Sequence, residues 1–206
     1  MADALQRMDP PIILASASSA RQAVMAAAGL IFTAQAAAVD EAAIKESTKA
    51  EGLPAGDAAM LLAEAKARRI AGRKPEALVI GADQILVCEG RWFDKPPDLA
   101  AARTQLLALR GRPHELVTAV ACWRNGQRIW QHLARPRLTM REFSEPFLDA
   151  YLAAEGETVL GSVGAYRLEG LGVQLFSAIE GEHSAILGLP MVPLLGFLRG
   201  HGVLLG

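Results

Sequence analysis

The chain has 206 residues, of which 51% are hydrophobic and 21% charged, a composition typical of a folded globular protein that excludes a disordered chain. The formal net charge of -1 and the lack of a basic block argue against broad attraction to nucleic acid, although a single nucleotide needs only a few local cations. The longest uncharged run, 185–198, is too short to span a bilayer, and the amino terminus lacks the order of a signal peptide. We expect a cytoplasmic protein that does not enter a membrane.

Residue types that often hold metals are scattered along the chain. Cys88 and Cys122 lie in apolar, strand-like runs and have no partner cysteine at zinc-site spacing, so we expect buried, inert thiols. The four histidines are isolated and also lack metal spacing, which favours structural or surface roles. These patterns give no indication of a zinc site.

Near the start of the chain, a short apolar strand at 12–14 leads into a serine-rich turn and a helix that ends at Gly29. The turn contains Ser16 and Ser18, whose hydroxyls and neighbouring backbone N–H groups would lie at the positive end of the helix, where an anion binds well. Plain capping of the helix by a serine is the alternative. Arg21 favours the anion, because a cation in the first turn opposes the helix dipole unless it meets a negative charge.

The next extended segment begins at residue 31 and ends at the adjacent carboxylates Asp40 and Glu41. Two such carboxylates can ligate a hard cation or simply face solvent. Residues 42–56 are mixed and polar, with Pro54 and Gly56 as breakers, so we expect a loop or a mobile segment there.

A helix is predicted for residues 57–71, with Leu61 among the residues of its apolar face. Lys66 falls inside the apolar arc and not opposite it. The usual explanation is that the lysine stem packs while the ammonium reaches water. The alternative is an ammonium directed into a cleft between helix and sheet.

The central stretch of the chain runs from residue 77 to residue 97. Apolar runs at 78–80 and 85–87 predict buried strand, and Glu89-Gly90 predicts a turn into a second short strand. Asp83 lies between the two runs and must be paired, metal-bound or solvated, because an unpaired buried charge is expensive. Lys95 precedes two prolines that could direct it back towards Asp83. A strand end with two solvated charges is the alternative.

The remaining elements continue the alternation of strands and helices. We predict a helix from Asp98 to Gly111, a hairpin of strands 114–124 and 127–141 interrupted at Pro136, a helix over 144–156, a glycine-rich loop over 161–172, a strand over 173–179 and a helix from Pro190 to Gly200. The predicted fold is a single α/β domain over residues 1–206, with a twisted mixed sheet covered by helices, a central cleft and a flexible N-terminus at 1–10.

Nearly all of the polar candidates lie at strand ends or on a helix beside them, where open α/β sheets place ligands. They are three cations, two carboxylates and the serine-rich turn. The cations suit phosphate oxygens, and the carboxylates suit a divalent ion that activates water. The sequence contains no Gly-x-x-x-x-Gly-Lys-Ser/Thr run, so it is not a P-loop hydrolase.

Several motifs occur in a fixed order over almost the whole chain. They are Leu14-Ala-Ser-Ala-Ser18, Val39-Asp-Glu41, Leu62-Ala-Glu-Ala-Lys-Ala67, Ile80-Gly-Ala-Asp-Gln84, Asp94-Lys-Pro96, Gly164-Ala-Tyr with Glu169-Gly-Leu-Gly172, and Gly188-Leu-Pro190. In this order they resemble the Maf family of nucleoside triphosphate pyrophosphatases, also called septum-formation-inhibitor-like proteins.

The resemblance implies a Maf/ITPase-like fold and hydrolysis of a nucleoside triphosphate to a monophosphate and pyrophosphate with Mg²⁺ or Mn²⁺. Asp83 would be the general base, and Glu41 would support the metal and the water together with it. The groups that would hold phosphates are Lys66, Lys95, Arg21, Ser16 and Ser18. The competing hypothesis is a regulator of septum formation that binds nucleotide without hydrolysing it. The sequence leaves open whether the protein forms a homodimer.

The choice of nucleobase depends on three further positions. Gln84 after the aspartate and Glu169 before Gly-Leu-Gly resemble the 7-methyl-GTP branch of the family, and a carboxylate can accept hydrogen bonds from a guanine-like edge. Ala20 stands where that branch has tryptophan, which removes a surface for stacking on a cationic base. We therefore expect guanine-type substrates with a weakened preference for the methylated base.

Overall fold

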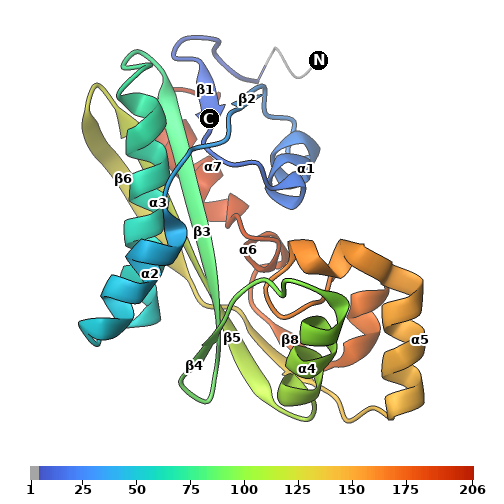
Figure 1. Cartoon of the computed structure of the whole chain (residues 1–206). Coiled ribbons are helices and arrows are strands. Elements are labelled where there is room, and N and C mark those ends of the chain that lie inside the picture. The colour runs from blue at the N-terminus through green and yellow to red at the C-terminus, as the bar shows by residue number, and fades with distance from the viewer. Residues whose placement is uncertain (1–4) are drawn as a thin grey trace. The chain divides into compact units, whose positions relative to one another are not determined.

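The computed structural model describes residues 5–206, in which strands and helices alternate as the sequence predicts (Figure 1). These residues divide into two compact units. The first unit comprises the chain up to Asp83, residues 118–134 and residues 183–206. The second unit comprises residues 84–117 and 135–182.

The first unit contains most of the parallel strands. Its elements are β1 (Ile12–Leu14), α1 (Ser19–Ala27), β2 (Thr33–Ala34), α2 (Glu41–Ala50), α3 (Ala55–Ala71), β6 (Gln127–Ala134), α6 (His183–Ile186) and α7 (Met191–Gly200), with the first part of β3 (Leu78–Cys88) and the last part of β5 (Pro113–Arg124). Strand β1 pairs in parallel with β2 and with β3, with Ile12 opposite Leu78.

Strands β1 and β3 are buried on both faces because successive side chains point to opposite sides of a strand. On one face Leu14 and Ile80 pack into a cluster with Met25 of α1 and with α7. On the other face Val79 joins a cluster that includes Ile70 of α3. Figure 1 shows α3 and α7 beside these strands. The continuous apolar runs in the sequence follow from this double burial.

The second unit contains mostly antiparallel pairs. Its own elements are β4 (Arg91–Phe93), α4 (Leu99–Leu109), β7 (Arg137–Met140), α5 (Glu145–Glu155), the 3-10 turns η2 (Gly156–Gly161) and η3 (Leu171–Leu175), and β8 (Phe176–Glu180). Strand β7 pairs with β5 and with β8, with Leu138 opposite His114 and Ile179. The ring of His114 is buried there, and its Nε2 lies 2.9 Å from the hydroxyl of Tyr166.

Over residues 5–206 the strands form an open mixed sheet of eight strands, in the order β2-β1-β3-β5-β7-β8, with β4 on β3 and β6 on β5. Seven helices of this described part flank it. The predicted α/β class and mixed sheet are therefore confirmed, whereas the predicted central cleft stays a prediction. No helix within residues 5–206 has both the length and the apolar character needed to cross a bilayer.

The sequence prediction is wrong in residues 42–56, where the structure has helix α2 and the start of α3 and no long loop. Asp40 caps α2, since its Oδ1 accepts a hydrogen bond of 3.0 Å from the N–H of Ala43. Alanine, glutamate and lysine then favour the helix. Leu61 was assigned to the apolar face of α3, but its side chain is exposed. Small alanines such as Ala63 and Ala67 fill that face instead.

The apolar run at 85–87 continues the strand begun at 78–80, as predicted, so Asp83 lies within β3 and not at a strand end. One further boundary differs from the prediction. Residues 173–175 belong to η3, so the last strand begins at Phe176 and not at Val173.

Residues 1–4 of the predicted flexible N-terminus lie outside the described residues. Farther along, the buried Gln6 exchanges two hydrogen bonds of 2.8 Å with the backbone of Ile31, and the N–H of Arg7 donates to the carbonyl of Val203. This part of the segment is held by hydrogen bonds.

Candidate active site

The turn between β1 and α1 is ordered by its own serines. The buried Ser16 accepts hydrogen bonds at Oγ from the N–H of Ser18, at 3.2 Å, and from Nη1 of Arg21, at 3.3 Å. Ser18 caps α1, because its Oγ accepts a bond of 3.4 Å from the N–H of Arg21. Capping by Ser18 and the contact of Ser16 with Arg21 therefore coexist and are not alternatives.

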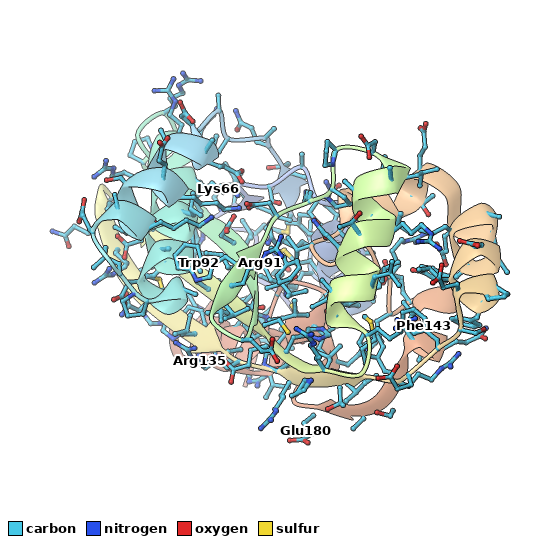
Figure 2. All side chains as sticks on the ribbon, turned by 60° about the horizontal axis from the view of Figure 1, so that its bottom comes forward. Lys66, Arg91, Trp92, Arg135, Phe143 and Glu180 are labelled. Carbon is cyan, nitrogen blue, oxygen red and sulfur yellow. The ribbon has the colours of Figure 1, made fainter. Side chains whose placement is uncertain are left out.

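Lys66 of α3 lies between two carboxylates. Its Nζ is 2.6 Å from Oδ1 of Asp83 on β3 and 2.7 Å from Oε1 of Glu41, the first residue of α2. The side chains of Lys66 and Asp83 are 9% and 6% exposed, whereas that of Glu41 is 47% exposed. Figure 2 labels Lys66. The ammonium is thus directed inward from α3, and snorkelling to water is ruled out.

A glycine allows this contact to form. A Cβ atom built on Gly81 of β3 would lie 2.1 Å from the carbonyl oxygen of Ala63 and 2.8 Å from the backbone nitrogen of Ala67, both in α3. Real Cβ atoms are not found at such distances, so any other residue at 81 would push α3 away from β3. Lys66 and Asp83 lie close to this point on the two elements, and their ion pair depends on the close approach.

Asp83 keeps one oxygen without a partner. Its Oδ1 is bound to Lys66, while Oδ2 is buried and has no hydrogen-bond partner among residues 5–206. Buried polar atoms are nearly always paired, and a carboxylate oxygen is a costly exception. An unpaired buried oxygen beside a paired one favours a role in holding a cation, a water molecule or a proton.

Arg21 adds a second cation to this cluster. Burial lowers the pKa of its guanidinium below the ordinary value, and attraction to Asp83 and to Glu41 opposes that shift. The two carboxylates are therefore close enough to act on Arg21. We call the residues Ser16, Arg21, Glu41, Lys66 and Asp83 the polar cluster of the first unit.

A divalent cation fits the carboxylates of this cluster as an incomplete site. Mg²⁺ prefers oxygen ligands and usually keeps several that are not from the protein. Glu41 and Asp83 could supply two such oxygens, Oδ2 of Asp83 among them. Within residues 5–206 no group of three or more His, Cys, Asp or Glu side chains could hold a metal by itself. Phosphate and water oxygens would have to complete the coordination.

Four further residues were predicted to belong to the site, namely Ala20, Gln84, Lys95 and Glu169. Ala20 is the second residue of α1 and is partly buried. In the second unit, Gln84 is partly buried on β3 and Lys95 is exposed after β4. Glu169 is also exposed, and its Oε1 accepts a hydrogen bond of 3.3 Å from Nε of Arg167. Their roles stay predictions.

Sequence reasoning missed two partners of the predicted residues. The carbonyl oxygen of Gly188 accepts a hydrogen bond of 2.8 Å from Nε of Arg21. Arg167 pairs with Glu169 and also with Glu155, at 3.6 Å. The contact of Arg167 with Glu169 could have been predicted, because the two opposite charges are only two residues apart in the sequence. A backbone carbonyl such as that of Gly188 leaves no mark on the sequence.

A cavity of about 490 Å³ lies between α2 and α3, beside Trp123. None of the predicted site residues lines it. It is therefore distinct from the polar cluster, although its two walls are the helices that carry Glu41 and Lys66.

Comparisons with known proteins agree with the family that the motifs resemble. The model of the Maf family, described as Maf-like protein, matches residues 11–201. A nucleoside triphosphate pyrophosphatase of Granulibacter bethesdensis is 57% identical over 193 residues, which cover 94% of this chain and 98% of the relative. One of Rhodospirillum rubrum is 57% identical, over 95% and 97%. A 7-methyl-GTP pyrophosphatase of Rhizobium meliloti is 47% identical, over 96% of this chain and 99% of the relative.

Proposed function

The chain belongs to the Maf family, and on this premise we propose that it is a nucleoside triphosphate pyrophosphatase that releases a monophosphate and pyrophosphate. The observation that carries the proposal is the buried ion pair of Lys66 and Asp83, with Oδ2 of Asp83 unpartnered among residues 5–206. A buried ion with an oxygen that has no partner is expensive to keep, which favours a functional role. A housekeeping role in the cytoplasmic nucleotide pool belongs to the same proposal.

The proposed reaction breaks the anhydride bond between the α- and β-phosphates. A water molecule attacks phosphorus, its proton passes to the carboxylate of Asp83, and pyrophosphate leaves with the electrons of the broken bond. A divalent cation held by Asp83 and Glu41 would polarise the phosphate oxygens and the water. Lys66 fixes both carboxylates and offsets their charge, which otherwise would repel a polyphosphate.

The turn between β1 and α1 would bind the phosphates of the substrate. Arg21 and the N-terminal N–H groups of α1 supply positive charge and donors for anionic oxygens. Ser16 and Ser18 hold the turn and Arg21 in place through the bonds described above. Lys95 would contribute a further cation, as the family motif implies.

The activity itself is tested by pyrophosphate release from a panel of nucleoside triphosphates with Mg²⁺ or Mn²⁺. We expect release that stops when the cation is chelated. Micromolar binding of nucleotide without any release would contradict the enzyme and favour a nucleotide-binding regulator of septum formation.

For the nucleobase, we propose that Glu169 and Gln84 favour guanine-type triphosphates over UTP and dTTP. A carboxylate accepts the paired donors of a guanine edge, whereas uracil and thymine present acceptors beside one ring N–H. A site built for such an edge rejects a base that leaves its carboxylate unmatched. Arg167 would hold the orientation of Glu169 through its hydrogen bond. Ala20, which offers no ring for stacking, would reduce the preference for the methylated base.

The base-reading role predicts that Glu169→Gln erodes the ratio of kcat/KM for GTP and 7-methyl-GTP over UTP and dTTP more than it lowers total activity. The exposed Glu157, also in the second unit, supplies the matched control Glu157→Gln, which should leave the ratios unchanged. A wild-type preference for UTP or dTTP would contradict the assignment, as would unchanged ratios in the Glu169 variant.

A further inference from the structure

The side chain of Arg21 is held on one side by the protein itself. Its Nε donates to the carbonyl oxygen of Gly188 at 2.8 Å, and its Nη1 donates to Oγ of Ser16 at 3.3 Å. Neither of these two bonds uses Nη2. A guanidinium is a rigid planar fork, so two fixed donors determine where the remaining donors point.

Gly188 is suited to this contact in two ways. Its φ is +92°, a conformation that side-chain-bearing residues rarely adopt. A Cβ atom at this position would also lie 3.0 Å from Nε and 3.4 Å from Nη2 of Arg21. Any larger residue would therefore both strain the backbone and displace the guanidinium.

The carbonyl of Gly188 is itself fixed by a turn in the first unit. The N–H of Gly188 donates to the carbonyl oxygen of Ala185 at 3.0 Å, and the hydroxyl of Thr118 donates to the same oxygen at 3.0 Å. Thr118 is fully buried. On the other side of the turn, the N–H of Met191 donates to Oγ of Ser184 at 2.9 Å. The turn over 184–191 is thus held at several points.

We propose that Gly188 is a positioning residue for Arg21 and that Thr118 supports it through the carbonyl of Ala185. The backbone carbonyl orients the guanidinium so that Nη2 and the outer N–H of Nη1 are presented to a phosphate group before the nucleotide arrives. The inference rests on the proposed function, because it assigns a substrate contact to Arg21. Preorganised donors of this kind bind without a further loss of side-chain freedom.

The test compares Gly188→Ala with a matched control, Gly29→Ala. Gly29 has a φ of +74°, and a Cβ there would meet nothing within 4 Å. Both variants suffer backbone strain, but only the first displaces Arg21. We expect Gly188→Ala to lose kcat/KM relative to the control, by about 10-fold or less, because the guanidinium has to shift by a fraction of an ångström and a misplacement of about 1 Å can cost roughly 100-fold. Equal losses in the two variants would overturn the proposal.

A double-mutant cycle with Arg21→Ala separates positioning from a general structural role. Once Arg21 is absent, Gly188→Ala should cost no more than Gly29→Ala, so the two effects must not multiply. Losses that multiply would overturn the proposal. Thr118→Val, which keeps the shape of the side chain but removes the hydroxyl, should act in the same direction more weakly and also lose its effect when Arg21 is absent. If Gly188→Ala does not fold, Thr118→Val takes its place in the same comparison.

The same cycle is measured by binding of a non-hydrolysable nucleoside triphosphate analogue, together with melting temperatures. If the wild-type protein binds the analogue but releases no pyrophosphate, the proposed activity fails, while coupling of Gly188 to Arg21 in binding still supports the positioning role. If hydrolysis proceeds and the coupling is absent, the positioning role fails and the activity stands.

Discussion

The two units each bury a polar pair, and the two pairs differ in charge. In the first unit Lys66 and Asp83 are buried as an ion pair, with Oδ2 of Asp83 left without a partner in residues 5–206. In the second unit His114 and Tyr166 share a hydrogen bond of 2.9 Å between neutral groups. Burial lowers the pKa of His114 from 6.5 to about 4, so that its ring is uncharged at neutral pH.

A neutral polar pair and an ion pair differ in what they cost to bury. A neutral hydrogen-bonded pair in an aromatic cluster, here with Phe176 beside both rings, costs little to bury. Buried ions lose hydration that their mutual attraction repays only with good geometry and full hydrogen bonding. Each pair leaves one atom without a hydrogen-bond partner among residues 5–206, Oδ2 of Asp83 and Nδ1 of His114, but only the first belongs to an ion. The retention of the ion pair is easier to explain by a reaction than by stability.

The largest effect is expected from Asp83→Asn, which removes the base but keeps the shape of the side chain. We expect kcat to fall by roughly 10²–10⁴-fold while nucleotide still binds, because loss of a general base typically costs this much. The measurement is steady-state pyrophosphate release with a parallel binding assay. Asp57→Asn, at an exposed carboxylate in the first turn of α3, is the control. Near-full turnover in the Asp83 variant would make Glu41 the candidate base.

The second largest effect is expected on stability, from a substitution that removes the cation of the buried ion pair. Lys66→Met should lower the free energy of unfolding by about 3–5 kcal/mol, because it leaves the carboxylate of Asp83 buried without its cation. Denaturant unfolding measures this change, with the exposed Lys74→Met as a control near zero. The double variant Lys66→Met, Asp83→Asn should recover part of the loss. A double variant no more stable than Lys66→Met would show that the burial of charge is not the cause.

The smallest effect is expected in the pH dependence of stability, through His114 of the neutral pair. Between the unfolded pKa of 6.5 and the folded value of about 4, the unfolded chain binds a proton at His114 and the folded chain does not. Stability from this residue is therefore fully present above pH 6.5 and is lost as the pH falls towards 4. From pH 7 to pH 5 the loss should be about 2 kcal/mol. Unfolding curves of His114→Gln should lack this component, and an identical pH dependence in both proteins would contradict it.

The sequence alone predicted those elements whose signals are local. Strand β1, the Asn125-Gly126 hairpin and the start of α7 after Pro190 depend on apolar runs and turn residues that are visible in a short window. Helix α2 was missed because its residues are polar and its support comes from α3. The burial of α3 was misjudged at Leu61, because small alanines such as Ala63 and Ala67 share the buried face with Leu62 and Ile70 and leave Leu61 outside it.

The polar cluster could be predicted in part. Glu41, Lys66 and Asp83 were proposed together, and the structure brings them within ion-pair distance. The run at 85–87 was predicted to continue the strand, but Asp83 was placed at a strand end, because a charge within an apolar strand becomes tolerable only when Lys66 arrives from another element. The bond from Arg21 to Gly188 joins residues 167 positions apart through a backbone carbonyl, which no side-chain pattern encodes.

The two carboxylates of the polar cluster are mounted on elements of unequal local stability. Asp83 lies within a strand of eleven residues that is mostly buried. Glu41 begins α2, in which Thr48 alone among the described residues is buried, and residues of α2 and α3 together line a cavity. Local unfolding starts where few apolar contacts hold an element, so we expect α2 to open at a lower free energy than β3. The carboxylate of Glu41 would then leave and rejoin the polar cluster while that of Asp83 stays in place.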